Sequence, residues 1–208
     1  MAKKVWKGGA MLSPVPPALV TCSDGEQDNV LTIAWTGIVN TIPPKTYISV
    51  RPSRHSYEII KKSGVFAINL TTSGLVRAAD YCGVHTGAKM NKFERCQLSK
   101  EPASEIPCPI LADSPLALEC RVTDIIPLGS HDMFLADIVA VDVDETLIGS
   151  DGKLHLEKAS LVAYAHGGYF ELGKQIGSFG FSVAKKKKNR TSSNQKYKTA
   201  SHTPKKGS

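Results

Sequence analysis

Short runs of alternating hydrophobic and polar residues recur along the chain, and this period of two predicts β-strands. Residues 46–51 alternate in this way, and so do residues 116–126. Segment 127–130 contains Pro and Gly, and a second β-rich run follows at residues 131–143, which predicts a β-hairpin. Compact apolar runs predict the remaining strands, at residues 18–22, 29–37, 65–70 and 159–165.

Amphipathic runs predict two helices and one short helical segment. The first helix covers residues 54–62, with Ser53 as its N-cap and Gly64 as its end. The second begins after Ser73, and the short segment covers residues 89–96. Because helices and strands do not alternate regularly, the pattern favours a mainly β fold, an antiparallel β-barrel with peripheral helices.

The basic charge of the chain is concentrated at its C-terminal end. The formal net charge is +7, but residues 185–208 hold nine Lys or Arg and no acidic residue. Residues 1–184 therefore carry 17 basic and 19 acidic side chains, a balance that does not indicate specific nucleic-acid binding. We predict one domain over residues 1–184 and a disordered basic tail over 185–208. Such a tail can contact RNA or acidic lipid, although a solvated tail without a dedicated partner is more common.

No apolar run is long enough for a membrane span, and the start of the chain lacks the apolar segment of a signal peptide. We therefore expect a cytoplasmic protein. Its five cysteines are scattered and odd in number, which argues against a disulfide framework. Cys82 and His85 have a metal-like spacing, but a zinc site usually shows two such ligand pairs. The sequence thus predicts buried or idle thiols and no metal site.

The strand predicted at residues 29–37 has a face of small, weakly polar residues. With a period of two, Val30, Thr32, Ala34 and Thr36 share this face. A flat ligand could lie close to the backbone there, and Gly37 would permit still closer approach. The alternative is an ordinary strand with one solvated face.

Two Arg and two Ser surround the predicted start of the first helix. Free N–H groups and the helix dipole favour an anion there, and the guanidinium groups of Arg51 and Arg54 suit phosphate oxygens. Ser53 and Ser56 add hydroxyl groups, and the neighbouring His55 could donate another hydrogen bond. The alternative is a capped, charged helix terminus. The Gly-rich nucleotide motifs are absent from the sequence, so a nucleotide would need such a pocket.

Local spacing yields no catalytic triad, because His131, His155 and His166 are isolated from nucleophiles and carboxylates. His131 opens a predicted strand after a tight turn, where a structural role is the common alternative.

Several segments together resemble the flavin reductase-like family, and in particular its flavoredoxin branch of FMN-binding split-barrel proteins. The resemblance covers about residues 8–183 in the same order, and the tail lies outside it. It is carried by Asn29–Gly37, Ile48–Ser56, Phe66–Leu70, Lys89–Phe93, His131–Ile138 and Tyr169–Gly173.

This resemblance implies an antiparallel split barrel that forms a homodimer with FMN near the interface. It places Asn29, Trp35, Thr36 and Gly37 against the flavin ring or ribityl chain, beside Thr32 and Ala34 of the small-residue face. It assigns the ribityl and phosphate groups to Arg51, Ser53, Arg54, His55 and Ser56. Lys89 and Lys92 would lie near the same site, with a contribution from the partner subunit, and His131 would lie at the open face of the flavin as the catalytic candidate.

The function implied is an NAD(P)H-dependent flavin reductase, in which hydride passes from nicotinamide to flavin N5 and electrons leave to an acceptor. The alternatives are a non-enzymatic electron carrier with tightly bound FMN, which exchanges electrons with a protein partner, and a binding protein whose barrel has lost the cofactor. The sequence does not distinguish NADH from NADPH, or FMN as substrate from FMN as prosthetic group.

Overall fold

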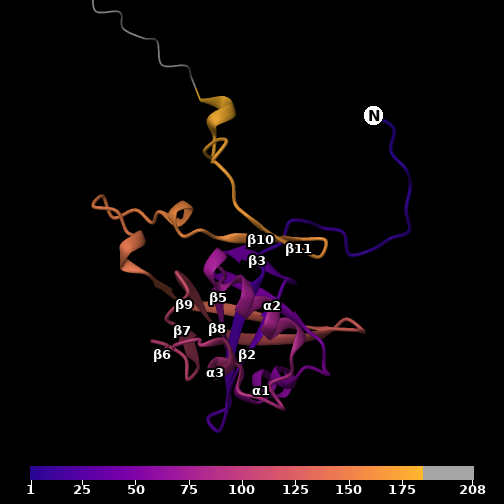
Figure 1. Ribbon diagram of the computed structural model, residues 1–208, viewed down its shortest axis with the longest axis vertical. Coiled ribbons are helices and arrows are strands. Elements are labelled where there is room, and N and C mark those ends of the chain that lie inside the picture. Colours follow the sequence, from indigo (N-terminus) through magenta and orange to yellow (C-terminus); the bar gives the residue numbers. More distant parts are fainter. Residues whose placement is uncertain (185–208) are drawn as a thin grey trace, which may run out of the picture. The chain divides into compact units, whose positions relative to one another are not determined.

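The computed structural model describes residues 1–184 (Figure 1). The chain forms two compact units, Met1–Gly173 and Lys174–Ser208. The predicted domain boundary at residue 184 therefore lies within the second unit, and the predicted tail lies outside the described residues. In the second unit the structure describes one 3₁₀ turn, η4 (Phe181–Val183).

The first unit is built on a seven-stranded sheet in which every neighbouring pair is antiparallel, as predicted. The strand order is β2-β1-β5-β8-β9-β4-β3. The strands are β1 (Ala18–Ser23), β2 (Asp28–Ile33), β3 (Thr36–Thr41), β4 (Pro44–Val50), β5 (Val65–Leu70), β8 (Leu116–Pro127) and β9 (Asp132–Val143). Two small two-stranded sheets are formed by β6 (Lys100–Pro102) with β7 (Pro109–Leu111), and by β10 (Val162–Ala165) with β11 (Gly168–Glu171).

The two edge strands of the large sheet, β2 and β3, follow one another in the sequence. They stand at opposite ends of the strand order, yet only Ala34 and Trp35 connect them. The sheet must therefore curl until its edges come near each other, although β2 and β3 do not pair within the described chain. The prediction of one continuous strand over residues 29–37 was wrong, because the chain leaves one edge at Ile33 and enters the other at Thr36.

The inside of the curled sheet holds the main core. Val20 of β1, Phe66 of β5 and Phe134 of β9 are fully buried there. Helix α1 (His55–Ser63) adds Tyr57 and Ile60 to the same cluster. This helix agrees with the prediction to within one residue at each end, and Gly64 terminates it in the left-handed conformation with φ 71°.

The predicted N-cap of α1 was wrong. Arg54 occupies the N-cap position, and no side chain within residues 1–184 accepts a hydrogen bond from the first turn. Ser53 lies one residue too early, in the turn closed by the hydrogen bond from Arg54 N to Arg51 O at 2.9 Å.

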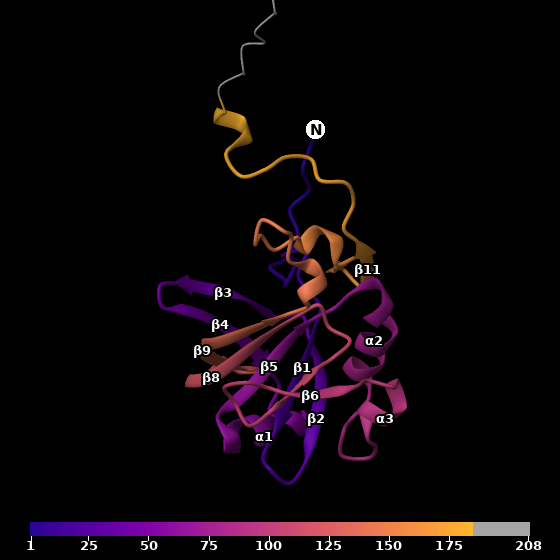
Figure 2. The ribbon, with the colours of Figure 1, turned by 90° about the vertical axis from the view of Figure 1, so that its left-hand side faces the viewer.

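Two further helices cover the outer face of β1 and β2 (Figure 2). The 3₁₀ turn η1 (Ser73–Leu75) leads into α2 (Val76–Val84), and α3 (Lys92–Cys96) follows after a connection. Helix α2 begins after Ser73, as predicted, but Ser73 is not its N-cap, because the 3₁₀ turn precedes the helix and the N-cap is Leu75. The short helix begins later than predicted, at the N-cap Asn91, whose Oδ1 accepts hydrogen bonds from Phe93 N and Glu94 N.

The outer face of β5 and β8 is covered by segment 103–110, with Ile106 and Cys108 packed on Ala67. Two short 3₁₀ turns, η2 (Glu145–Leu147) and η3 (Leu156–Lys158), separate β9 from β10. No helix among residues 1–184 is both long and apolar enough to cross a bilayer.

Candidate functional site

A cleft of about 130 Å³ lies between β2, the start of α1 and the connection from α2 to α3. It brings together six of the predicted site residues, although they are spread over more than sixty positions of the chain. These six are Asn29, Ser53, Arg54, His55, Ser56 and Lys92.

The start of α1 supplies main-chain N–H groups to this cleft. Because no described side chain caps the helix, the positive end of its dipole faces solvent and any bound ligand. The guanidinium of Arg54 lies at the same place and is exposed. The arrangement favours an anion with several oxygen acceptors.

Asn29 and Ser56 form a buried hydrogen bond in the wall of the cleft. Asn29 Nδ2 donates to Ser56 Oγ at 2.7 Å. Beneath them, the Cys22 thiol donates to Asn29 O at 3.7 Å, and burial raises the pKa of this thiol to about 12. Across the cleft, Gly87 lies so close that a Cβ there would overlap the Asn29 side chain. Any side chain at this position of the connection between α2 and α3 would displace the side chain of Asn29.

Lys92 places a buried cation in the same cleft. Its side chain is 3% exposed, and Nζ donates to Cys82 O at 3.2 Å and to His85 O at 3.3 Å, at the C-terminal end of α2. Burial lowers the pKa of the ammonium, and the charge of Arg54 also lowers it. An anionic ligand would offset the repulsion between Lys92 and Arg54 and would stabilise the charged form of Lys92.

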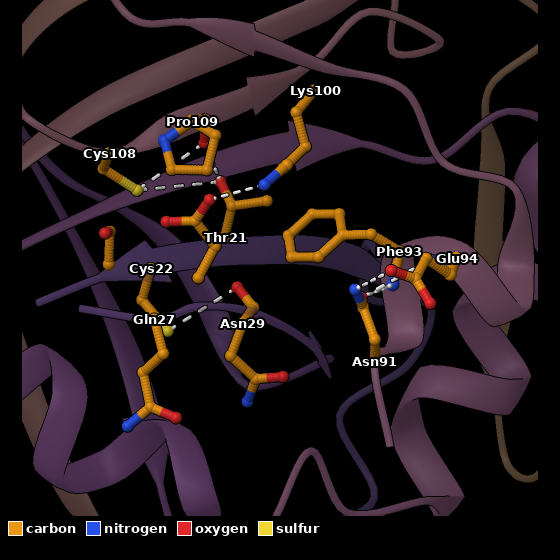
Figure 3. Close-up of polar contacts among 12 residues, drawn as sticks. Thr21, Cys22, Gln27, Asn29, Asn91, Phe93, Glu94, Lys100, Cys108 and Pro109 are labelled. Carbon is orange, nitrogen blue, oxygen red and sulfur yellow. Dashed lines mark hydrogen bonds and ion pairs between the residues drawn. The ribbon is translucent and has the colours of Figure 1, made fainter. Parts of the chain in front are cut away.

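A wider cavity of about 490 Å³ adjoins the cleft and shares Asn29, His55, Gly87 and Lys92 with it. Figure 3 shows Asn29 between Gln27 and the side chains of Asn91 and Phe93 at the start of α3. His55 Nε2 lies 3.2 Å from Gln27 Oε1, which orients the imidazole at the boundary between the two cavities.

His131 lies at the turn between β8 and β9, where Asp132 pairs with Val50. This pairing brings the imidazole beside the start of α1. Burial lowers the pKa of His131, and the charges of Arg51 and Arg54 lower it further. Ser130 Oγ lies 2.9 Å from His131 Nδ1. The positive charges of Arg51 and Arg54 thus lie close enough to act on His131.

The small-residue face predicted on the strand from Val30 does not exist as one open surface. Thr32 lies under α2, and its hydroxyl donates to Ala79 O. Thr36 begins the other edge strand, and its hydroxyl donates to Tyr47 O at 2.6 Å. The strand break separates the two threonines, because Ala34 and the exposed Trp35 form the link between the sheet edges.

Gly37 lies at the start of β3 against the ring of Tyr47, and a Cβ at this position would be 3.5 Å from Tyr47 Cε1. Lys89 is exposed and lines neither of the two cavities within the described chain. Its assignment to the partner's site stays a prediction.

Sequence reasoning missed the residues that α2 and its following connection add to the cleft: Cys82, His85, Thr86 and Gly87. The ring of His85 stacks on Tyr81 at a centroid distance of 3.9 Å, and its Nδ1 lies 3.1 Å from Tyr81 O. Two glycines near the end of α2 were the available signal, since a long connection is often functional. Among the described residues, no group of three His, Cys, Asp or Glu side chains is placed to hold a metal ion.

The fold belongs to a known class of protein. A sequence model of the flavin reductase like domain matches residues 11–173, so the chain belongs to the flavin reductase-like family. Its members are flavin-associated proteins with the antiparallel architecture described above.

Three relatives illustrate the range of the family. Flavoredoxin of Desulfovibrio vulgaris superposes with a TM-score of 0.82 at 27% identity, covering 88% of this chain and all of that one. An NADPH-flavin oxidoreductase of Streptomyces viridifaciens is 27% identical over 150 residues, 68% of this chain and 74% of its own. A protein of Aeropyrum pernix without a functional description is 30% identical over 132 residues, 63% of this chain, which spans half the length of that relative.

Proposed function

We propose that the chain binds FMN, with its phosphate at the start of α1. The observation that carries this proposal is the convergence of an uncapped helix start, Arg54 and the buried Lys92 on one cleft. The oxygens of a phosphate dianion would accept hydrogen bonds from these groups, and its negative charge would balance their positive charge. Ser53 and Ser56 would add hydroxyl contacts, and the adjoining 490 Å³ cavity gives room for a larger organic group.

The bound flavin would supply the redox chemistry, since its N5 accepts a hydride and the reduced ring passes electrons onward. The residues of the chain bind and orient it. Arg51 and Arg54 attract the phosphate, and the Asn29–Ser56 hydrogen bond fixes the cleft wall. His131 would donate or accept a hydrogen bond at the rim of the cleft, beside the charges of Arg51 and Arg54.

The activity we propose is that of an NAD(P)H-dependent FMN oxidoreductase. Membership of the family supports it, and so does the likeness to a protein described as an NADPH-flavin oxidoreductase. In this activity a nicotinamide would be the hydride donor, and a separate small molecule or protein would be the electron acceptor.

A second candidate is an electron carrier that keeps FMN bound and exchanges electrons only with protein partners. The superposition on flavoredoxin along the whole of that chain favours it. The two candidate functions use the same site and differ only in whether a nicotinamide can reduce the bound FMN.

We also propose that the protein is a cytoplasmic homodimer. Five free cysteines are typical of a reducing compartment, where NAD(P)H is also present. The β3–β4 hairpin projects from the barrel (Figure 2) and exposes Ile38 at 61% and Ile42 at 90%. Exposed apolar side chains of this kind are typical of an interface, and a second subunit would cover them.

The test is an absorbance spectrum of the purified protein, with FMN added where needed, before and after anaerobic NADH or NADPH. Flavin bands that bleach with either nicotinamide would support the reductase. Bands that resist both nicotinamides but bleach with a reduced ferredoxin would support the carrier. Failure of FMN to bind at all would overturn the proposed site.

A further inference from the structure

The side chains of two cysteines on different helices lie next to each other, with their sulfur atoms not bonded. Cys82 lies in the last turn of α2, and Cys96 is the final residue of α3. Their Sγ atoms are 4.0 Å apart, which is close to van der Waals contact. A disulfide bond of about 2.05 Å needs the two sulfurs to approach by roughly 2 Å more.

The pair lies in the wall between two hollows of the surface. Cys96 is half-buried and lines a cavity of about 720 Å³ together with Arg95 and Tyr81. Cys82 is buried and lines the cleft that contains Lys92. Cys96 is the more exposed of the two thiols, so it is the one that a small oxidant in solution reaches.

We propose that Cys82 and Cys96 form an intramolecular disulfide when the protein is exposed to hydrogen peroxide. The sulfur of Cys96 attacks one peroxide oxygen, the O–O bond breaks, and the thiol proton leaves with the other oxygen as water. This step oxidises Cys96 to a sulfenic acid. The sulfur of Cys82 then attacks the sulfur of Cys96, the S–O bond breaks, and the hydroxyl leaves with the Cys82 proton as a second water. Two thiols lose two electrons in total, and one peroxide is reduced to two waters.

The surroundings of Cys82 suit the second step of this sequence. Burial and the neighbouring Cys96 together raise the pKa of its thiol to about 12, so Cys82 stays protonated and does not react with peroxide by itself. The ammonium of Lys92 favours loss of this proton, and its Nζ is held on the Cys82 carbonyl at 3.2 Å. Lys92 thus lies where it stabilises negative charge on the attacking sulfur.

Helix α3 is the shorter of the two helices that carry the pair. Helix α3 has five residues, and Gln97 follows it in the left-handed conformation with φ 55°. A single helical turn next to a connection can shift more easily than a strand with neighbours on both sides. Closing the remaining sulfur–sulfur gap therefore leaves the barrel intact.

The test uses the full chain, treated with hydrogen peroxide, quenched with an alkylating reagent and analysed by mass spectrometry with and without dithiothreitol. We expect loss of two hydrogens per chain, peptides joined through Cys82 and Cys96, and complete reversal by dithiothreitol. Cys96→Ser should abolish the cross-link. Cys108→Ser, which removes a buried thiol hydrogen-bonded to Pro109 O, should leave it unchanged.

Peptide mapping of the unmodified sequence keeps the test independent of how well either variant folds, and no flavin is needed for the readout. Sulfinic or sulfonic acid at Cys96 without a cross-link would overturn the proposal. A disulfide between two chains, a cross-link to any other cysteine, or two unreacted thiols would overturn it equally.

Discussion

At the scale of single residues, Arg54 and Lys92 bring the same charge to the cleft in different ways. Lys92 is buried and fixed by two carbonyl groups, so its position is set before any ligand arrives. Arg54 is exposed and stands at the N-cap of α1. A ligand phosphate would therefore meet one fixed cation and one that can adjust.

Replacing Arg54 by Ala should weaken FMN binding by about 10- to 100-fold, the cost of one or two charge-assisted hydrogen bonds. Riboflavin binding should change little, because riboflavin carries no phosphate. Fluorescence titration of both ligands measures the difference, with Arg77→Ala, an exposed arginine of α2, as the matched control. An equal loss for the two ligands would sink the phosphate assignment.

The buried Glu119 and the half-buried Asp142 form an acidic pair on the neighbouring strands β8 and β9. Glu119 is fully buried, and its carboxylate accepts hydrogen bonds from Ser104 N, Glu105 N and Ile106 N, which hold its pKa low despite burial. Asp142 Oδ2 is buried and has no hydrogen-bond partner among the described residues. Burial and the charge of Glu119 raise the pKa of Asp142 to about 6 from 3.8, with a smaller contribution from Glu101.

The folded protein binds the proton of the Asp142 carboxyl more tightly than the unfolded chain does, and this difference stabilises the fold. The stabilisation is complete below the unfolded pKa of 3.8. The contribution is lost as the pH rises through about 6. Asp142→Asn removes the charge that Glu119 repels, at every pH. We expect its melting temperature to exceed that of the parent protein by about 2–4 °C above pH 6 and to match it in acid. Thermal melts across this range test the sign, with the exposed Glu171→Gln as control. A variant less stable than the parent at neutral pH would contradict the assignment.

At the scale of elements, the sequence predicted those parts whose pattern is local. Helix α1 with its glycine end, strand β5 and the β8–β9 hairpin all follow from spacing within one segment. The break at Ala34 and Trp35 could not be predicted in this way, because alternation continues across it. Only the long-range strand order requires the chain to change edges there.

The candidate site also has a part that local sequence predicted and a part that only long-range contacts create. The half at the start of α1 was visible in the sequence because Arg51, Ser53, Arg54 and Ser56 are close together in it. The other half comes from α2 and its following connection, which meets Asn29 only after folding. Thr32 shows the opposite error, since its hydroxyl was expected to face a ligand and is hydrogen-bonded to Ala79 O of α2.

Gly87→Ala should test the connection between α2 and α3 directly. The added Cβ would displace the Asn29 side chain and break its hydrogen bond to Ser56. We expect flavin affinity to fall by about tenfold, the equivalent of one buried hydrogen bond, for FMN and riboflavin alike. Gly74→Ala is the control, because its Cβ would make only an ordinary contact with Thr72. Unchanged affinity for both ligands would show that Asn29 does not shape the site.

At the scale of the whole molecule, the exposed β3–β4 hairpin gives the proposed dimer a defined test. Ile38→Asp would place a charge where we expect an apolar contact between subunits, at a cost of about 3 kcal/mol, or roughly 100-fold in dimer dissociation constant. Thr41→Asp adds the same charge to the same hairpin at an exposed polar position and should leave the dimer intact. Light scattering after size exclusion separates the outcomes. A variant Ile38→Asp that stays dimeric at micromolar concentration would place the interface elsewhere.

Removing residues 185–208 should leave the flavin content of the protein unchanged. Every residue assigned to the candidate site lies between positions 29 and 131, within the part of the chain that the structure describes. The ratio of flavin absorbance to protein absorbance in the purified truncated chain measures this. A colourless truncated protein would mean that the basic segment takes part in cofactor binding.

The two-residue link at Ala34 and Trp35 has a mechanical consequence for the barrel. Along the rest of the sheet, moving two strands apart breaks a ladder of hydrogen bonds. Between β2 and β3 no strand hydrogen bonds join the edges within the described residues. The two-residue link alone keeps them close, because it limits how far they can separate. The barrel is thus closed on this side by two linking residues, and on its other sides by hydrogen-bonded pairs of strands.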